Sequence, residues 1–556
     1  MELYVHLNNK ILIYNFLGFL YFFFSLILLI FLSFISFPLI LSFNVSSIMS
    51  LDLFDFSIYL DFYSVLYLSV LFSIVGSIHF FSLYYMNLDL NYIRYLIILN
   101  LFVFSMFILV ITPNFLLFLF GWDGLGFSSF LLVAWYGCFV SRSASIKTFL
   151  INRLGDGLFL SSLSLIIFQG YFNYFSYDYL HIFLIIIFLF ASFTKSSHYP
   201  FSSWLPDAMA APTPISALVH SSTLVTAGLY FIFRFSFLFS YEIMFLVHQL
   251  GLWTIFLGSL CGCFSNNSKK IVAFSTMSQL GLISFSLSIG LVELSFFYLI
   301  IHALFKALIF ISLGSLMYNN WHNQDIRHLN NLWFQNPLIL LNVFYGLFVL
   351  SGFPFFSCFY IKELILNNNF FLNMNIFSSF IFYLSMFFTC YYSFRLFYFL
   401  VFSNNFFFNK NNFNNNQNIL VFFILYVMIL NIGIFYFYNY FFFLVNCSVL
   451  LIIFYSLLSI LVSFLNLNFT NFFYIINYFI YLEFLNIVIN SNQVYYLIGD
   501  YFYCFYDLGL LPFHFIGFFN NFSFNNINNF VQKYYFLNIL LVFGWGLIII
   551  FIFFYI

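Results

Sequence analysis

Long apolar segments follow one another along almost the whole chain, and they constrain its fold more than any other feature of the sequence. A helix that crosses a bilayer needs about 20 apolar residues. Only 6% of the 556 residues are charged, whereas a soluble domain carries about 25%. In lipid only helices and closed barrels satisfy the backbone, and continuous apolar runs favour helices over strands. The sequence therefore predicts an all-α polytopic membrane protein.

The number of runs long enough to span a bilayer predicts about 15 transmembrane helices. The runs begin near Ile11, Phe62, Ile93, Phe115, Phe149, Ile182, Pro214, Leu246, Ile271, Leu294, Leu338, Ile376, Ile419 and Val449, and a last one extends from Leu537 to Tyr555.

Composition and spacing exclude several functional classes. The formal net charge of −1 provides no basic surface for nucleic acid, so no nucleic-acid partner is expected. The seven cysteines lack the spacing of iron–sulfur, zinc or disulfide sites, and no glycine pattern indicates a nucleotide site. We therefore expect no metal, cofactor or redox centre in this chain. Glu2 and Lys10 precede an apolar run without a small-residue cleavage site, so no removable signal peptide is expected.

Charged residues outside the apolar runs separate onto opposite sides when the runs are counted from the N-terminus. The basic ones are Lys10, Arg94, Arg142, Lys147, Lys269, Lys270, Arg327, Lys410 and Lys533, and the acidic ones are Asp52, Asp55, Asp61 and Asp178. By the positive-inside rule the basic side is the cytoplasm or the matrix. This places the N-terminus inside and the C-terminus outside. If loop basic residues served only solubility, this one-sidedness would not be expected.

A second group of charges lies within the apolar runs, where an ionisable side chain costs about 2.5–3.5 kcal/mol. The basic members are Arg153, Lys195, Arg234, Lys306, Lys362 and Arg395, and they are accompanied by Asp123, Asp156, Glu363, His220 and His302. One or two of them are expected to be structural ion pairs or snorkelling ends. The group as a whole favours a polar path that carries protons or other ions.

Two places interrupt the helical pattern inside apolar runs. Four prolines lie between residues 200 and 214, just after Lys195, and Ser351-Gly352-Phe353-Pro354 precedes Lys362 and Glu363. Transporters place ion sites at such broken helices because freed backbone groups line a cavity there. Each interruption alone is equally consistent with an ordinary helix boundary or kink. Because both have a lysine nearby, they favour transport.

Residue spacing supports the same interpretation. His302 and Lys306 are four residues apart and share one helix face. Arg153 and Asp156 are three apart, which makes a local ion pair a strong alternative to a functional role. His220 follows the prolines by about two helical turns and is expected near Lys195, where a histidine can pass protons through bound water.

The segment from Ser202 to Gly228 reads SSWLPDAMAAPTPISALVHSSTLVTAG. Further blocks are GWDGLG at 121–126, NRLGD at 152–156, KKIVAFSTMSQ at 269–279, HALFKA at 302–307, QDIR at 324–327 and FYIKE at 359–363. In this order they closely resemble the chain 5 family of mitochondrial NADH:ubiquinone oxidoreductase, respiratory complex I, over about residues 60 to 400. Members of this family are antiporter-like, proton-pumping subunits of the membrane arm.

The resemblance implies a role for each polar site. The acidic residue at Asp123 would pair with Lys195, and Arg153 and Asp156 would modulate that pair from an adjacent helix. Lys195, His220, His302 and Lys306 would form a central hydrophilic axis, which Lys362 and Glu363 would link to the outside.

This sequence departs from the family at several of these positions. The family usually has Glu at Asp123, a second histidine at Tyr298, Gln at His198 and an acidic residue at Asn267. Asp is one methylene shorter than Glu, so the Asp123 carboxylate lies closer to its helix. We expect a water molecule to bridge it to Lys195. His198 and Tyr298 are candidate relays.

The resemblance also suggests a domain organisation. We expect an N-terminal span and an outer hairpin-like segment (1–60), and an antiporter-like core (61–400). An Asn-rich matrix loop with two further spans (401–470), a shortened lateral amphipathic segment (471–535) and a final anchor (536–556) would follow.

The function implied is proton translocation in the mitochondrial inner membrane, within a complex that oxidises NADH and reduces ubiquinone. NADH, FMN, iron–sulfur clusters and ubiquinone would be bound by other subunits. Expected partners are other membrane-arm subunits, especially the antiporter-like chain 4, accessory subunits, and lipids such as cardiolipin. Two alternatives stay open, a chain of a multisubunit cation/proton antiporter and a structural arm subunit that no longer pumps.

Overall fold

The computed structural model describes residues 2–32, 34, 38–43, 56–87, 89–168, 182–329, 336–354, 356–371 and 376–401. All of them belong to one compact unit, Met1–Ile476. The predicted Asn-rich loop, lateral segment and final anchor lie outside the described residues and stay predictions.

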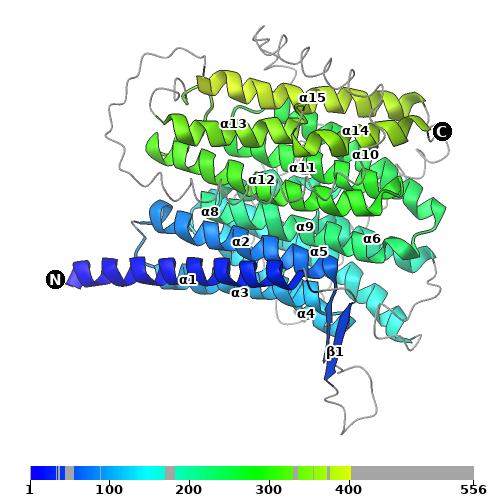
Figure 1. Cartoon of the computed structure of the whole chain (residues 1–556), viewed down its shortest axis with the longest axis horizontal. Helices are drawn as coiled ribbons and strands as arrows, with labels where there is room; N and C mark the ends of the chain where they lie inside the picture. Colours follow the sequence, from blue (N-terminus) through cyan, green and yellow to red (C-terminus); the bar gives the residue numbers. More distant parts are fainter. Residues whose placement is uncertain are drawn as a thin grey trace, which may run out of the picture. The chain divides into compact units, whose positions relative to one another are not determined.

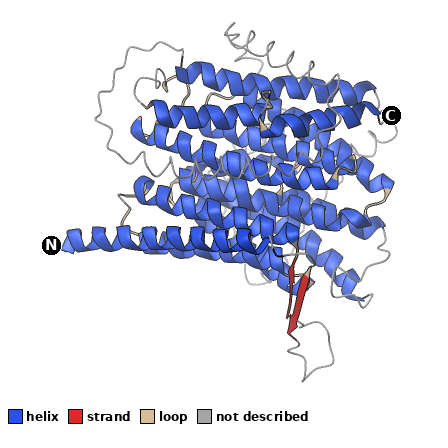
Figure 2. Cartoon of the chain, in the orientation of Figure 1, coloured by secondary structure: helices blue, strands red, loops and turns tan. Residues whose placement is uncertain are grey.

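Helices make up nearly all of the described secondary structure (Figure 2). In chain order the α-helices are α1 (Glu2–Leu32), α2 (Phe62–Tyr85), α3 (Tyr92–Ile111), α4 (Phe115–Val133), α5 (Phe139–Phe168), α6 (Ile182–Lys195), α7 (Trp204–Asp207), α8 (Thr213–Ile215), α9 (Leu224–Phe235), α10 (Tyr241–Phe264), α11 (Ser268–Ser288), α12 (Val292–Asn319), α13 (Pro337–Ser351), α14 (Ser357–Phe371) and α15 (Ile376–Val401). Short 3₁₀ turns occupy Phe201–Ser203, Ala208–Ala210 and Ser236–Leu238, and a π-helix occupies Ser216–Thr223.

Eight helical segments of the described residues are long and apolar enough to cross a membrane. They are Lys10–Leu32, Phe62–Tyr85, Tyr92–Ile111, Thr213–Leu238, Tyr241–Phe264, Ser268–Ser288, Val292–Asn319 and Phe377–Val401, and Leu117–Val133, Phe183–Lys195 and Ile339–Ser351 are shorter apolar helices. The mostly helical membrane fold is confirmed, and the count of about 15 spans stays a prediction.

The run predicted to begin near Phe149 belongs to the longer helix α5, which begins at Phe139. Arg142 and Lys147 occupy its first turns, and because they lower the local hydropathy, an apolar-run criterion misses that part of the helix. Helix formation there does not depend on apolar character, since Arg and Lys are good helix formers.

Two strands precede α2. β1 (Leu39–Phe43) pairs antiparallel with β2 (Phe56–Leu60), with Leu39 opposite Leu60, and the pair projects from one end of the neighbouring helices (Figure 1). Asp61 then ends the strand and begins α2. Its side chain accepts from the Ser64 amide while the Ser64 hydroxyl accepts from the Asp61 amide, a reciprocal capping box that fixes where the helix starts.

Burial separates central from peripheral helices. The apolar windows of α11 and α12 are each 94% buried, whereas that of α1 is 11% buried. α11 packs against α10 and α12, and α12 packs against α13 and the Ser216–Thr223 π-helix. The centre of the unit is therefore built from α11 and from α12, which carries His302 and Lys306.

Helices end at Lys195 and at Ser351, the residues that come just before or begin the two interruptions expected from the sequence, and that these are broken helices within a membrane stays a prediction. α6 ends at Lys195 and is followed by short turns before the π-helix and α9. Gly228 lets α9 approach the end of α6 closely, because a Cβ there would lie 2.5 Å from the carbonyl oxygen of Ser192. α13 ends at Ser351, and Gly352 (φ +80°) turns the chain toward α14 in a left-handed conformation that favours glycine.

Candidate functional site

Lys195 is the end residue of α6, and its side chain is completely buried. Its ammonium group donates to the backbone carbonyl of Trp122 on α4 and lies 4.2 Å from the centroid of the Trp122 ring. The Asp156 Oδ1 atom on α5 lies 3.7 Å from Lys195 Nζ. Three helices therefore hold one buried cation, which needs such partners to remain charged away from water.

The carboxylate next to Lys195 is not the one that the resemblance implied. Asp156 forms the ion pair with Lys195 and also lies 3.4 Å from Arg153 Nη1. Asp123 lies 3.9 Å from the same Arg153 atom, and its side chain is 35% exposed, whereas that of Asp156 is 4% exposed. Arg153 thus stands between the two carboxylates. The Asp123 carboxylate therefore lies beside Arg153 at the edge of the unit.

His198 and His220 extend this region toward the centre. His198 lies in the turn after α6, and its two ring nitrogens are 2.7 Å from Ser196 Oγ and 2.9 Å from Ser284 Oγ on α11. His220 lies in the π-helix with its ring centroid 5.9 Å from the Trp204 ring. Both His220 nitrogens are buried without a hydrogen-bond partner among the described residues, which is rare for buried polar atoms in native proteins.

His302 and Lys306 are both completely buried on α12. Lys306 Nζ donates to Ser275 Oγ on α11 and lies 3.5 Å from the Val272 carbonyl oxygen. Both ring nitrogens of His302 lack a hydrogen-bond partner in the described part of the chain. One turn earlier, the hydroxyl of Tyr298 donates to Gln279 Oε1. The tyrosine at this position is therefore anchored to α11 by a hydrogen bond.

Lys362 reaches back from α14 to the end of α13. Its ammonium group donates to the carbonyl oxygens of Leu350 at 2.7 Å and Ser351 at 3.1 Å. The C-terminal carbonyls of a helix carry partial negative charge, so the helix end stabilises this cation. Glu363 follows it on α14 and is also buried. Lys306 and Lys362 are close enough to interact electrostatically.

Sequence reasoning missed Gln279, which lies between Tyr298 on α12 and the end of α13 that binds Lys362. Its amide nitrogen lies 3.5 Å from the carbonyl oxygen of Leu350, the acceptor of Lys362, and 3.4 Å from Tyr392 Oη on α15. The signal was present, because Ser275, Ser278 and Gln279 recur at helical spacing inside a run that the structure buries. Polar residues on one face of a buried helix indicate a polar interface.

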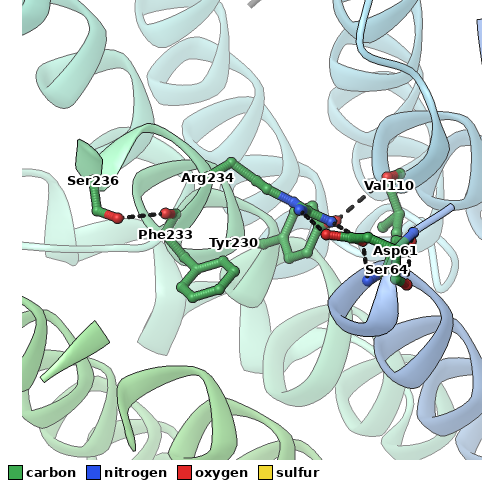
Figure 3. A network of polar contacts seen from close by, with 7 residues as sticks. All are labelled: Asp61, Ser64, Val110, Tyr230, Phe233, Arg234 and Ser236. Carbon is green, nitrogen blue, oxygen red and sulfur yellow. Dashed lines mark hydrogen bonds and ion pairs between the residues drawn. The ribbon is translucent and has the colours of Figure 1, made fainter. Parts of the chain in front are cut away.

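Two of the basic residues predicted within apolar runs contact the ends of neighbouring helices. Arg234 in the last turn of α9 forms a bidentate ion pair with Asp61 at the start of α2 (Figure 3). Its Nη1 and Nη2 atoms donate to the two carboxylate oxygens at 2.6 and 2.8 Å. Arg395 donates to the Ser265 carbonyl oxygen at 2.8 Å, just after α10. Burial alone would raise the pKa of Asp61, but the hydrogen bonds and charge of Arg234 hold this pKa below its ordinary value of 3.8. The Arg234–Asp61 contact is a structural ion pair of the kind that the sequence left open, whereas Arg395 contacts neutral oxygens.

Metal chemistry has no candidate site in the described ranges, where no three His, Cys, Asp or Glu side chains gather as a metal site would require. The arrangement instead presents lysines and histidines buried among carbonyls, hydroxyls and one carboxylate pair. Such groups can take up and release protons.

Known proteins resemble this chain in sequence and in fold. The family described as NADH:quinone oxidoreductase/Mrp antiporter matches residues 112–389. Curated relatives named NADH-ubiquinone oxidoreductase chain 5 include that of Locusta migratoria, 38% identical over 371 residues (65% of each chain), and that of Mytilus edulis, 41% identical over 317 residues (56% of each chain). That of Anopheles arabiensis is 40% identical over 350 residues, which cover 62% of this chain and 89% of the relative.

The matched region spans less than two thirds of the length of the first of these relatives. Among solved structures, the Mrp complex from Dietzia sp. DQ12-45-1b aligns with a TM-score of 0.70 at 18% identity, covering 83% of this chain and 56% of that one. An archaeal membrane-bound sulfane sulfur reductase aligns with a TM-score of 0.69 at 19% identity, covering 81% and 92%. At these identities the structural likeness establishes the fold alone.

Proposed function

Because the chain belongs to the NADH:quinone oxidoreductase/Mrp antiporter family, we propose that it translocates protons as an antiporter-like membrane-arm subunit of an NADH:ubiquinone oxidoreductase. Other subunits bind NADH, FMN, iron–sulfur clusters and ubiquinone and perform the redox reaction. The complex lies in the mitochondrial inner membrane, with the N-terminus of this chain in the matrix and its C-terminus in the intermembrane space. The names of the curated relatives support this assignment.

One observation carries the proposal. Lys195, Lys306 and Lys362 are at most 2% exposed, yet in the described residues only Lys195 has a carboxylate within ion-pair distance. Lys306 and Lys362 contact neutral oxygens instead. Burying an ionisable group without a counter-ion is expensive, and a purely structural protein has no reason to retain two of them. A site that gains and loses a proton needs such groups.

The interaction energy of the Lys195 ion pair is comparable to the cost of moving one proton against the membrane potential. At 3.7 Å and an effective dielectric constant of about 20, two unit charges attract by about 4 kcal/mol. Moving one charge against 100 mV costs about 2.3 kcal/mol. Opening this pair therefore changes the local electrostatic energy by more than one such transfer costs, while the net free energy comes from the redox reaction in the other subunits. Asp156 is the direct partner, and Arg153 and Asp123 adjust the pair from its exposed side.

The remaining site residues form the path. Protons pass from Lys195 through His220 to His302 and Lys306, with His198 and Tyr298 as auxiliary relays, and reach Lys362 and Glu363. The interruptions after Lys195 and Ser351 are broken helices within the membrane, in a chain that crosses it about 15 times. The unpartnered ring nitrogens of His220 and His302 support water along this path.

A partner subunit covers the face formed by α4 and α5. Arg153 and Asp123 are 41% and 35% exposed although they lie in apolar helices, and such charges do not face lipid. The covering subunit is the antiporter-like chain 4, and accessory subunits and cardiolipin occupy other parts of the surface.

The test is to purify the complex through a tag on this chain and reconstitute it into liposomes. NADH and ubiquinone are expected to drive proton movement in the vesicles. If the tagged chain purifies without NADH-oxidising partners and exchanges sodium for protons, the cation/proton antiporter alternative is correct. If it purifies with those partners and NADH oxidation moves the full number of protons after Lys195, Lys306 and Lys362 are all replaced by Met, the chain has a structural role.

A further inference from the structure

Polar residues form a stripe along one face of α9 and the π-helix before it. They are His220, Thr223, Thr226, Tyr230 and Arg234. Thr226, Tyr230 and Arg234 are four residues apart on α9, which places their side chains on one helix face, and His220 and Thr223 precede them in the π-helix. At about 1.5 Å per residue the stripe is roughly 20 Å long. It leads from the buried centre of the candidate site to the helix end where Asp61 lies.

Hydroxyl groups line the middle of this stripe. Thr226 donates to the Thr223 carbonyl oxygen at 2.9 Å, so the 2.7 Å contact between Thr226 and Tyr67 on α2 has the tyrosine as donor. Thr223 donates to the Leu218 carbonyl oxygen at 2.7 Å. The His220 end of the stripe has two ring nitrogens without a partner in the described residues. Hydroxyl groups and unpartnered ring nitrogens are the groups that a proton path uses, because each offers a lone pair to the next donor.

Arg234 closes the far end of the stripe (Figure 3). Its Nε and Nη2 atoms donate to the Tyr230 hydroxyl oxygen at 2.9 and 2.6 Å, and Nη1 and Nη2 donate to the two carboxylate oxygens of Asp61 at 2.6 and 2.8 Å. The side chains of Arg234 and Asp61 are only 12% and 13% exposed. The Ser64 amide also donates to Asp61 Oδ1 at 2.8 Å.

The chemistry of these groups determines what they can pass on. A proton moves along a hydrogen-bonded chain only where the next atom offers a lone pair. A guanidinium group has five N–H donors and no acceptor, and it does not lose its proton in proteins. The phenol oxygen of Tyr230 receives two of these donors, and a hydroxyl oxygen has two acceptor lone pairs. Neither Arg234 nor Tyr230 can therefore accept a proton arriving along the stripe.

We propose that Arg234 is a proton block, which prevents protons from leaking along the polar stripe of α9 between the centre of the site and the Asp61 end of the bundle. The inference rests on the proposed proton translocation, since only a chain that moves protons through its centre needs such a block. A mere clamp between α2 and α9 would depend on Asp61 as much as on Arg234. The block depends on the donors that Arg234 presents to Tyr230, which remain when Asp61 loses its charge.

The experiment measures passive proton leak through the reconstituted complex, with no NADH present, from the fluorescence of pyranine inside the vesicles after an imposed potassium diffusion potential. Arg234→Met frees the oxygens of Tyr230 and Asp61, and the leak is expected to rise several-fold above wild type. Asp61→Asn and Arg234→Lys keep a donor-only cation beside Tyr230, and their leak is expected to stay at the wild-type level. Adding Thr226→Val to Arg234→Met interrupts the stripe and is expected to return the leak toward wild type.

Three results would overturn the proposal: wild-type leak in Arg234→Met, equal leak in Asp61→Asn and Arg234→Met, or a leak that Thr226→Val does not reduce. If Arg234→Met does not assemble, Arg234→Gln, which is also uncharged, replaces it with the same expected leak. NADH-driven proton movement by the wild-type complex is measured separately. Its absence would refute the proposed function, whereas the leak comparison addresses the block alone.

Discussion

Replacement of Asp156 by Asn should uncouple this chain, whereas the same replacement at Asp123 should do so only slightly. The Asp156 carboxylate lies 3.7 Å from Lys195 Nζ and is almost fully buried, so the attraction lost is about 4 kcal/mol at an effective dielectric constant of about 20. That loss exceeds the roughly 2.3 kcal/mol needed to move a charge against 100 mV. Asn has nearly the same shape, so the change removes charge with little change in packing.

Asp123→Asn is the matched control. Its carboxylate contacts Arg153 at 3.9 Å with both side chains more than a third exposed, and an exposed pair of this kind contributes about 0–1 kcal/mol. The difference between the two variants therefore comes from the position of each carboxylate and not from the type of substitution.

The assay follows NADH oxidation and proton movement together in liposomes that contain the complex. Asp156→Asn is expected to keep NADH oxidation but to move fewer protons per NADH and to sustain a lower membrane potential, and Asp123→Asn is expected to stay close to wild type. The reasoning is refuted if Asp123→Asn uncouples as strongly as Asp156→Asn, because Asp123 would then be the partner that matters.

Three further predictions concern the framework of the site. Gly228→Ala places a Cβ 2.5 Å from the Ser192 carbonyl oxygen, whereas nothing lies within 4 Å of a Cβ at Gly157. Thermal unfolding should therefore show a loss of about 1–3 kcal/mol for the first variant and none for the second. Since the pKa of Asp61 is held below 3.8, its contribution to stability is complete above that pH and is lost as the pH falls through the lowered value. Acid unfolding of Asp61→Asn should lack this component. Tyr298→Phe leaves a buried amide oxygen without its donor, which costs about 1–3 kcal/mol. The Tyr298→Phe variant should lower the number of protons moved per NADH more than it lowers the rate of NADH oxidation. An equal loss of both would contradict a role of Tyr298 in the proton path.

The sequence predicts those features of the fold and the site that depend on the local spacing of residues. Apolar runs of about 20 residues identified most of the described spans. The cost of charge in lipid identified Lys195, Lys306 and Lys362, which the structure buries. These properties belong to single segments of the chain.

Partners of the charged residues depend on how distant segments pack, and sequence spacing carries no such information. Arg234 pairs with Asp61, 173 positions away, and nothing near either residue indicates the other. The choice between Asp123 and Asp156 as the partner of Lys195 depends on the packing of α4, α5 and α6. Gln279 carries no charge that would draw attention to it in the sequence. Its role follows only from the fold, which places its amide beside the Leu350 carbonyl oxygen that accepts from Lys362.

The central claim is that a proton on Lys195 takes part in translocation, and the number of protons moved per NADH oxidised tests it most directly. Lys195→Met removes the buried cation between Trp122 and Asp156. Lys147→Met is the matched control, because that lysine pairs with Asp207 at 2.5 Å and is 39% exposed. The account predicts that the Lys195 variant assembles and oxidises NADH but loses proton movement, while the Lys147 variant keeps it. Normal proton output from the Lys195 variant would contradict the account.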